Sequence, residues 1–376
     1  TIIEYRYDIL KESKWRWIPL RVRYDKTADF RNGGNNFGNA YHVANNNWNS
    51  IHYPITEEMI TTGENIVNEQ LDEVYYNYDG KMSKTKGLRD FHNKYIKKLL
   101  IQNVSQRGDT LIDMAVGKGG DIPKWIDANL TFVLGIDISR DNIDNRHDGV
   151  CARYLRAKEK NLDIPKALFV TGDTSKNLRN VDAIEGDKNK QVVKAIFGEM
   201  SKEIAKKLGK GVSDNYAIGT EGFDICSIQF AIHYMFKNKE TLYNFIQNVS
   251  EVTKVGGYFI GTSYDGKYMF ETLKNISKGN SITKIDQETN TKIWEVTKQY
   301  DNTDFDDDET SLGYRIDVYQ ETINKVFSEY LVNYTYLSRL LENYGFIEHT
   351  KIYDDDVKTK QLKKTFKSTS FKELFY

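Results

Sequence analysis

The sequence has few cysteines, few histidines and almost no net charge. Its two cysteines, Cys151 and Cys226, stand far apart, which excludes a disulfide framework and favours a reducing intracellular compartment. The six histidines and two cysteines show no metal-ligand spacing, so we expect no structural zinc. The 53 basic and 54 acidic residues exclude a globally basic nucleic-acid binder, although they leave room for a local basic groove.

Long apolar runs and a leader are also missing. No run of about 18 apolar residues occurs, so we expect no membrane span. The first residues lack the charged-then-apolar layout of a signal peptide. The chain opens directly on a strand-like run, so we expect it to be a piece of a longer polypeptide. Hydrophobic residues make up 39% of the 376, enough for one large domain with an appendage, or for two domains.

Secondary-structure patterns divide the chain near residue 58. Before that point, two strand-like runs, IIEYRYD and WRWIPLRVRYDKT (through Thr27), precede an Asn/Gly-rich stretch, 32–49, that is typical of a solvated loop. After it, helical patterns cover 57–76 and 88–104. Five continuous apolar runs then alternate with helical segments: TLIDMAV, TFVLGIDI, ALFVTGD, FDICSIQF and GYFIGTSY. Continuous apolar runs indicate strands buried on both faces, and therefore a parallel sheet between helices.

Two segments interrupt this alternation. A long polar insertion, residues 174–222, contains a helical pattern at 191–208. Residues 292–317 predict a hairpin around the acidic run 304–309, which we interpret as a solvated turn rather than a metal site.

A nucleotide-like ligand is predicted at the ends of the first three strands. Gly117, Gly119 and Gly120 form a tight turn between a strand and a helix, where backbone can approach a ligand closely. Because the spacing is not GxGxxG and Ala115 replaces an expected glycine, a nicotinamide cofactor is disfavoured. Asp137 ends the next strand, where a carboxylate can bind ribose hydroxyls. Taken alone, it could equally cap a helix.

Four motifs in this order resemble the mRNA cap guanine-N7 methyltransferases of eukaryotes and large DNA viruses: VGKGGD, GDTSK, FDICSIQFAIHYMF and GGYFIGT. The upstream LRDFHNKYIKKLLI resembles the helix that grips S-adenosylmethionine (SAM) in that family. The resemblance runs from about Met59 to the end. It implies an α/β, Rossmann-like class I methyltransferase fold with a mainly parallel seven-stranded sheet and helices on both faces, preceded by a small β-rich segment.

The resemblance also implies a reaction and its ligands. SAM would donate a methyl group to N7 of the terminal guanine of the mRNA cap, leaving S-adenosylhomocysteine, without a metal. The implied cofactor-binding residues are Lys97, Ala115, Gly117, Asp137, Asp173, Gln229 and Tyr234. The implied cap-binding residues are Asn93, Lys118, Lys124, Arg153, Phe230, His233, Tyr234 and Glu329. A cap-contacting tyrosine near the family's C-terminus matches Tyr376, and Ser328 replaces the family's usual proline.

The implied chemistry needs no acid or base. Guanine N7 already carries a lone pair, so Phe230, His233, Tyr234 and Glu329 would only align it with the methyl group. Phe230 and Tyr234 would stack on the guanine, Glu329 would accept hydrogen bonds from its edge, and the basic side chains would pair with the triphosphate. Without the resemblance, the default interpretation is that His233 has a structural role. Phe230 and Tyr234, four residues apart, would then pack in the core.

The first 60 residues resemble the last part of the oligonucleotide-binding-fold domain of mRNA guanylyltransferases. Arg21, Arg23, Asp25 and Lys26 match its triphosphate-orienting motif, but the KxDG nucleophile is missing, since residues 77–80 read NYDG. We therefore predict a guanylyltransferase tail and linker at 1–58 and a methyltransferase domain at 59–376. The order resembles fused viral capping enzymes. It implies capped mRNA as substrate, guanylyltransferase and triphosphatase domains on the same full-length polypeptide, and the host cytoplasm or the virion as location.

Two other functions fit part of the pattern. A SAM-dependent methyltransferase of the same fold could act on another RNA or on a small molecule. Methyl transfer to a cap dinucleotide, compared with uncapped RNA, would separate that function from cap methylation. A non-catalytic RNA-binding module of a capping complex is the other alternative, and only Ala115 favours it. SAM binding that is lost in Asp137→Ala would exclude it.

Overall fold

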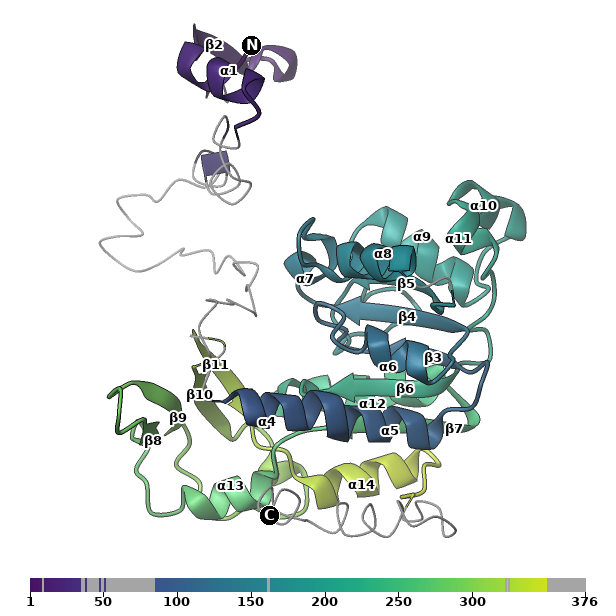
Figure 1. Cartoon of the computed structure of the whole chain (residues 1–376). Coiled ribbons are helices and arrows are strands. Elements are labelled where there is room, and N and C mark those ends of the chain that lie inside the picture. Colours follow the sequence, from purple (N-terminus) through teal and green to yellow (C-terminus); the bar gives the residue numbers. More distant parts are fainter. Residues whose placement is uncertain are drawn as a thin grey trace. The chain divides into compact units, whose positions relative to one another are not determined.

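The computed structural model describes residues 1–8, 10–34, 85–160, 163–321 and 325–349, together with the single residues 38, 47, 48, 51 and 323. The chain divides into two compact units, Thr1–Leu71 and Asp72–Tyr376 (Figure 1). The domain boundary predicted at 58, the helical pattern at 57–76, most of the Asn/Gly-rich stretch and Tyr376 lie outside the described residues.

The first unit contains an antiparallel pair of strands, β1 (Ile3–Tyr7) and β2 (Trp17–Val22), with a short turn of 3-10 helix, η1 (Ser13–Trp15), between them. The strand-like pattern that continued through Thr27 is wrong beyond Val22, because α1 (Tyr24–Arg31) begins there. The Thr27 hydroxyl donates to the Arg23 carbonyl at 2.8 Å and accepts from the Ile2 N–H at 2.9 Å. This tertiary contact ties the helix to β1 and overrides the local strand preference.

The second unit is built on a parallel sheet with the strand order β5-β4-β3-β6-β7 (Figure 1). Its strands are β3 (Thr110–Asp113), β4 (Phe132–Asp137), β5 (Lys166–Thr171), β6 (Phe223–Gln229) and β7 (Thr253–Thr262). All five predicted strands and their parallel pairing are confirmed. The count of seven is not confirmed: the described residues give this sheet five strands, and the remaining strands of the unit form a separate sheet.

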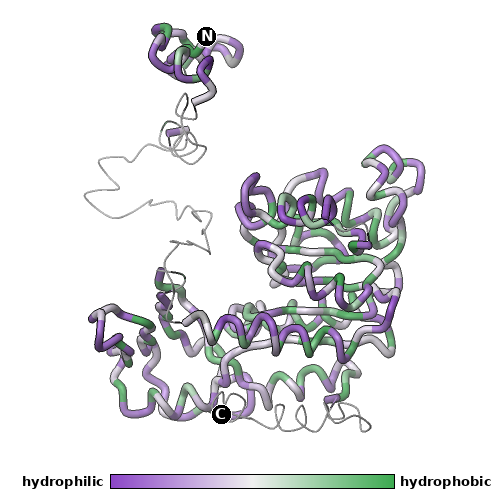
Figure 2. Tube along the Cα trace, viewed as in Figure 1, coloured by the Kyte–Doolittle hydropathy of each residue, from purple (hydrophilic) through white to green (hydrophobic). Residues whose placement is uncertain are grey.

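Helices cover both faces of the parallel sheet, as predicted. The helices of one face are α5 (Lys97–Val104), α6 (Ile122–Asp127), α7 (Arg140–Asp144) and α8 (Val150–Lys160). The helices of the other face include α9 (Asp187–Ile196), α12 (Lys239–Val252) and α14 (Tyr334–Asn343). Strands β3 and β4 are buried along their whole length, which explains their unbroken apolar sequences. Apolar residues accordingly mark the central strands in Figure 2.

The helix predicted at 88–104 is confirmed as one continuous segment. It consists of α4 (Lys86–Asp90), a π-helical stretch η2 (Phe91–Ile96) and α5. Wider π turns inside α-helices are frequent at functional sites.

The insertion 174–222 belongs to the core more than its polar composition indicated. The single helix predicted at 191–208 is wrong: α9 stops near Gly198, which has φ +75°, and is followed by α10 (Lys202–Lys207) and α11 (Lys210–Ser213). Apolar side chains from the insertion, among them Val193, Ile196 and Phe197, pack into the core beside the sheet. The insertion therefore helps to cover one face of the sheet.

A second, antiparallel sheet has the order β11-β10-β9-β8. Its strands are β8 (Ser281–Ile285), β9 (Lys292–Lys298), β10 (Arg315–Gln320) and β11 (Lys325–Tyr330). Pairing of β9 with β10 confirms the predicted hairpin. The short helix α13 (Gly266–Thr272) precedes the sheet, and η4 (Glu309–Ser311) lies in the connection between β9 and β10. Carboxylates of the acidic run form ion pairs, Lys267 with Asp307 and Lys239 with Glu309.

Candidate functional site

The glycine turn after β3 lies against the end of β4. The Gly117 N–H donates to the Asp137 Oδ2 at 2.7 Å. Gly117 and Gly119 have φ angles of +53° and +72°, which favour glycine. A Cβ on Gly119 would lie 2.7 Å from the Val150 Cγ2, whereas a Cβ on Gly117 would meet nothing within 4 Å. Gly119 is thus required by packing, while Gly117 borders open space that a ligand can occupy.

Asp137 is a buried carboxylate held by the protein itself. Its Oδ1 accepts hydrogen bonds from the Ser139 N–H at 3.0 Å and the Asn142 Nδ2 at 2.9 Å. Burial raises the pKa of this carboxyl above its ordinary value. The alternative that Asp137 caps the next helix is wrong, because Ser139 is the N-cap of α7. A ligand-binding role therefore remains for Asp137.

The predicted cofactor residues gather at one edge of the sheet. Ala115, Asp137, Asp173 and Gln229 lie at or just beyond the carboxyl ends of four adjacent strands, β3, β4, β5 and β6. The Gln229 side chain is fixed by contacts with Ser227 (3.1 Å) and Thr262 (3.1 Å). Asp173 accepts from the Ser175 N–H at 3.0 Å. Ligands of open α/β sheets bind at this edge, where the connections leave in opposite directions.

A buried cluster of charged side chains adjoins the glycine turn. Asp121 pairs with Lys97 at 3.4 Å and with Lys124 at 2.7 Å. Burial opposes ionisation, yet these lysines keep the pKa of Asp121 below its ordinary value. Asp113 lies nearby, and burial together with Asp121 raises its pKa to about 7. Sequence reasoning assigned no role to either aspartate. The last residue of VGKGGD was the available signal for Asp121.

Phe230 follows Gln229 in a strained conformation. Its φ of +56° is unusual for a bulky side chain, and its N–H is held by the Thr262 carbonyl (3.1 Å) and hydroxyl (3.0 Å). The ring centre lies 4.8 Å from the His92 ring and 5.6 Å from the Lys97 Nζ. The structure thus brings a residue predicted to bind the cofactor next to one predicted to bind the cap.

Phe230 and Tyr234 do not share a helix face. The intervening backbone turns at Ala231, which precedes the 3-10 helix η3 (Ile232–Lys237). Both aromatic side chains are half-buried rather than part of the core. The alternative that they pack in the core at helical spacing is therefore wrong.

His233 and Glu329 form a buried polar pair between η3 and β11. The His233 Nε2 lies 3.8 Å from the Glu329 Oε1, too far for a hydrogen bond. Within the described residues, both ring nitrogens of His233 and the Oε2 of Glu329 have no hydrogen-bond partner, and the two residues are only 4% and 7% exposed. Burial lowers the pKa of His233 to about 3 and raises the pKa of Glu329 to about 7. Each unpartnered buried group costs about 1–3 kcal/mol, so a ligand that supplies partners would be favoured.

The basic residues predicted to bind phosphate are not gathered in an open cluster. Lys118 is 5% exposed, and its Nζ lies 2.8 Å from Asp148 and 3.1 Å from Asp141. Lys124 is buried against Asp121, whereas Arg153 is exposed and donates to the Lys118 carbonyl at 2.9 Å. Asn93 is half-buried on η2. A triphosphate clamp made of these residues stays a prediction.

The motif of the first unit is held by ion pairs. Arg21 and Arg23 pair with Glu4 at 3.0 and 3.4 Å, and Arg23 also pairs with Asp25 at 2.8 Å. Its predicted role in orienting a triphosphate is not tested by these contacts.

Membrane and metal sites can be judged only for the residues that the structure describes. Across those ranges, no helix is long and apolar enough to cross a membrane. Nor does the same part of the chain bring three or more histidine, cysteine or acidic side chains together as metal ligands.

Comparison with known proteins gives the following similarities. Residues 63–374 match the model of the mRNA (guanine-N(7))-methyltransferase domain. The chain is 29% identical over 362 residues to a probable mRNA-capping enzyme of Acanthamoeba polyphaga mimivirus, which covers 91% of this chain and 29% of the relative. It is 29% identical over 248 residues to the mRNA cap guanine-N(7) methyltransferase of Candida glabrata, covering 61% of this chain and 49% of that protein. The chain thus spans less than half the length of either relative. Among solved structures, an S-adenosylmethionine-dependent methyltransferase from Clostridium acetobutylicum is 12% identical with a TM-score of 0.37, over 81% of this chain and 87% of that one.

Proposed function

Because this chain belongs to the mRNA (guanine-N(7))-methyltransferase family, we propose that it transfers a methyl group from SAM to N7 of the guanine cap of mRNA. The observation that carries the proposal is the buried, unpartnered pair of His233, three residues after Phe230, and Glu329, whose carboxylate lies 3.8 Å from the imidazole. An enzyme that binds two ligands side by side needs a second set of polar groups next to its cofactor edge, and this pair can supply it.

The residues at the sheet edge fit the cofactor. Asp137 would accept hydrogen bonds from the ribose hydroxyls, and the open space at Gly117 would admit the methionine portion. Lys97 would face the carboxylate of the cofactor, while Asp173 and Gln229 would hold the adenine and the reacting end. When bound, SAM supplies a methyl group on a positively charged sulfur, which makes that methyl group strongly electrophilic.

Glu329 and His233 suit a guanine ring. The Watson–Crick edge of guanine offers two neighbouring N–H donors, which an ionised Glu329 carboxylate can accept together. Adenine does not offer this pair, so a buried carboxylate discriminates against it. The neutral imidazole of His233 can supply a donor to the guanine carbonyl oxygen. Phe230 and Tyr234 would stack on the ring, which is worth about 1–3 kcal/mol per base.

The protein then has only to align two reactants. Guanine N7 carries a free lone pair at neutral pH, so no residue needs to remove a proton. Thr262 fixes the strained backbone of Phe230. The Phe230 ring is thereby held at the end of β6, next to the predicted cofactor residues. Good alignment of two bound reactants can contribute about 7–11 kcal/mol to the lowering of the barrier.

The proposal extends to the phosphates of the cap and to the other domains of the full-length polypeptide. Exposed Arg153 would meet the triphosphate first, and Lys118 would exchange Asp148 for phosphate. Because the chain is similar to a probable mRNA-capping enzyme of a virus, we extend the proposal to guanylyltransferase and triphosphatase domains on the same full-length polypeptide. The host cytoplasm as the place of action stays a prediction.

The test is methyl transfer from labelled SAM to GpppG, ApppA and uncapped RNA. We expect transfer to GpppG alone, and a loss of about two orders of magnitude in kcat/KM in Glu329→Ala, with SAM affinity unchanged in calorimetry. Equal transfer to uncapped RNA would instead indicate a methyltransferase with another substrate. SAM binding without any transfer would indicate a non-catalytic module, and a matching loss of SAM affinity would mean that Glu329 is misplaced.

A further inference from the structure

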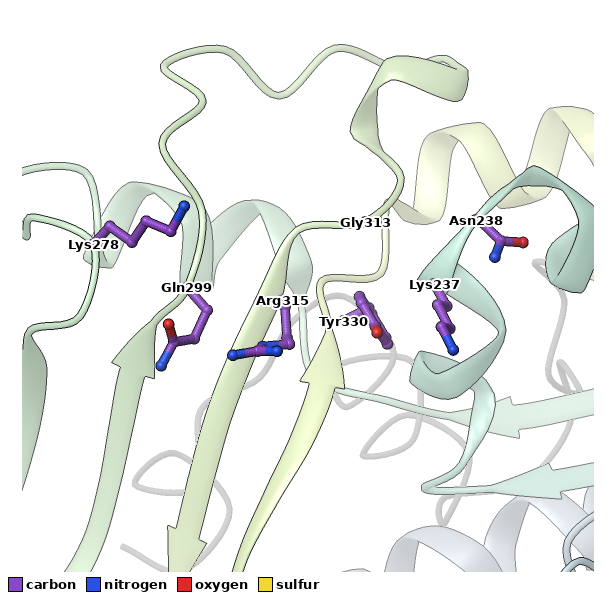
Figure 3. Close-up of a pocket in the computed structure, with 7 residues that line it drawn as sticks. All are labelled: Lys237, Asn238, Lys278, Gln299, Gly313, Arg315 and Tyr330. Carbon is purple, nitrogen blue, oxygen red and sulfur yellow. The ribbon is translucent and has the colours of Figure 1, made fainter. Parts of the chain in front are cut away.

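A basic groove lies outside the site described above. It has a volume of about 470 Å³. Figure 3 shows the polar and charged side chains that line it: Lys237, Asn238, Lys278, Gln299, Arg315 and Tyr330. Three of these carry positive charge and no carboxylate lines the groove, although the chain as a whole has a net charge of −1. The groove is therefore a local positive feature on a neutral protein, and it selects for an anionic ligand.

The secondary structure lines these side chains up. Arg315 and Tyr330 are direct cross-strand partners on β10 and β11, so their side chains share a face of the antiparallel sheet. The Gln299 N–H donates to the Arg315 carbonyl at 3.0 Å, which continues the row across the sheet. In Figure 3 the Tyr330 ring stands between Arg315 and Lys237. An aromatic ring flanked by cations and amides is the combination that binds single-stranded nucleic acid.

The two lysines and the arginine differ in how far they are neutralised. Lys278 pairs with Asp301 at 2.8 Å, and the Arg315 Nε lies 3.5 Å from Asp317. The Asp317 carboxylate also accepts hydrogen bonds from Ser328 and Gln299, so it is shared among three donors. Lys237 has no carboxylate within ion-pair distance among the described residues. Lys237 and Arg315 are thus the cations most available to a phosphate.

Shared elements join the groove to the candidate cap site. Tyr330 follows Glu329 on β11, and successive side chains of a strand point to opposite faces. Lys237 lies three residues beyond Tyr234 on η3, about 6 Å along a 3-10 helix. β11 is the edge strand of its sheet and η3 packs beside it, so a transcript held at Glu329 would have to pass this edge next to η3 to reach Tyr330.

We propose that this groove binds the backbone of the transcript just downstream of the cap, with Lys237 and Arg315 on its phosphates and a base on Tyr330. The inference rests on the proposed function, because it takes capped RNA as the substrate. An acidic protein segment would use the same cations but would have no need of the aromatic ring. Contacts in the groove would make the affinity for capped RNA higher than the affinity for a cap dinucleotide.

The experiment compares a capped 20-nucleotide RNA with GpppG, using the whole chain. The double variant Lys237→Ala/Arg315→Ala is set against Lys284→Ala, which removes an exposed lysine of the same sheet that does not line the groove. For the double variant we expect Kd and KM for the capped RNA to rise about tenfold, since two solvent-exposed ion pairs with phosphate are lost. GpppG kinetics should stay unchanged. The slope of log affinity against log salt concentration should become shallower by about 1.4, at about 0.7 per phosphate contact.

Three outcomes would overturn the inference. One is an unchanged Kd for the capped RNA, and another is an equal loss with GpppG. The third is a polyglutamate peptide that binds more tightly than RNA and whose binding is lost in the double variant. That result would assign the groove to a protein partner. Kd is read by fluorescence anisotropy without turnover, so it tests the groove even if the protein methylates neither substrate and the proposed function fails.

Discussion

Glu329→Gln is expected to stabilise the free protein above neutral pH while it lowers kcat/KM for cap methylation. Burial raises the pKa of Glu329 from 4.5 to about 7. Between these pH values the unfolded chain releases this proton and the folded protein keeps it, so the free energy of unfolding falls as pH rises. A difference of about 2.5 pKa units corresponds to about 3 kcal/mol, all of it lost by pH 8. Glutamine has nearly the same shape and does not ionise, so the variant avoids this loss.

Urea unfolding at pH 4.5 and pH 8, without ligands, measures the effect. The control is Glu271→Gln, whose exposed carboxylate pairs, among the described residues, with Lys274. We expect Glu329→Gln to match the wild type at pH 4.5 and to exceed it at pH 8 by up to about 3 kcal/mol, while the control changes equally little at both. The reasoning is refuted if the variant is no more stable than the wild type at pH 8, or if the difference is the same at both pH values.

The same substitution should harm function, because a carboxamide cannot accept both guanine donors. We expect kcat/KM for GpppG to fall by about two orders of magnitude. A variant that is more stable and inactive would identify Glu329 as a residue kept for its ligand rather than for the fold.

Three further predictions concern the cofactor edge and the RNA. Asp137→Ala should weaken SAM binding about 10- to 100-fold in calorimetry, because the carboxylate that would accept from both ribose hydroxyls is lost; intact SAM affinity would contradict the assignment. Gly119→Ala should lower the melting temperature, since its Cβ would lie 2.7 Å from Val150, whereas Gly117→Ala should mainly weaken SAM binding; the reverse pattern would place the ligand elsewhere. Binding of capped RNA should weaken steeply between low and moderate salt as counterions are released, and a flat response would exclude the phosphate contacts.

The sequence predicted the sheet edge well, for a physical reason. Continuous apolar runs report strands buried on both faces, and parallel strands bring their carboxyl ends together. The placement of Asp137 and Asp173 at this edge therefore follows from the strand pattern, whereas Gln229 was assigned from the family resemblance. The glycine turn was equally visible, since a left-handed backbone at Gly117 and Gly119 calls for glycine.

The remaining features depend on contacts that no local pattern encodes. Asp121 pairs with Lys97 across 24 residues of chain, and Lys118 turns away from solvent to meet Asp148. Polar composition hid the apolar face of the insertion. The basic groove joins residues of η3 with residues of the antiparallel sheet, which lie about 80 residues apart in sequence, so only the fold brings them together.

The central claim is that a purine pocket faces the cofactor edge of the sheet. Its most direct test is a crystal structure with S-adenosylhomocysteine and a cap analogue, in which the distance and angle between guanine N7 and the cofactor sulfur are measured. We predict the guanine between Phe230 and Tyr234, its edge hydrogen-bonded to Glu329, and N7 directed in line at the sulfur. A guanine bound elsewhere, or an N7 that points away from the sulfur, would contradict the account.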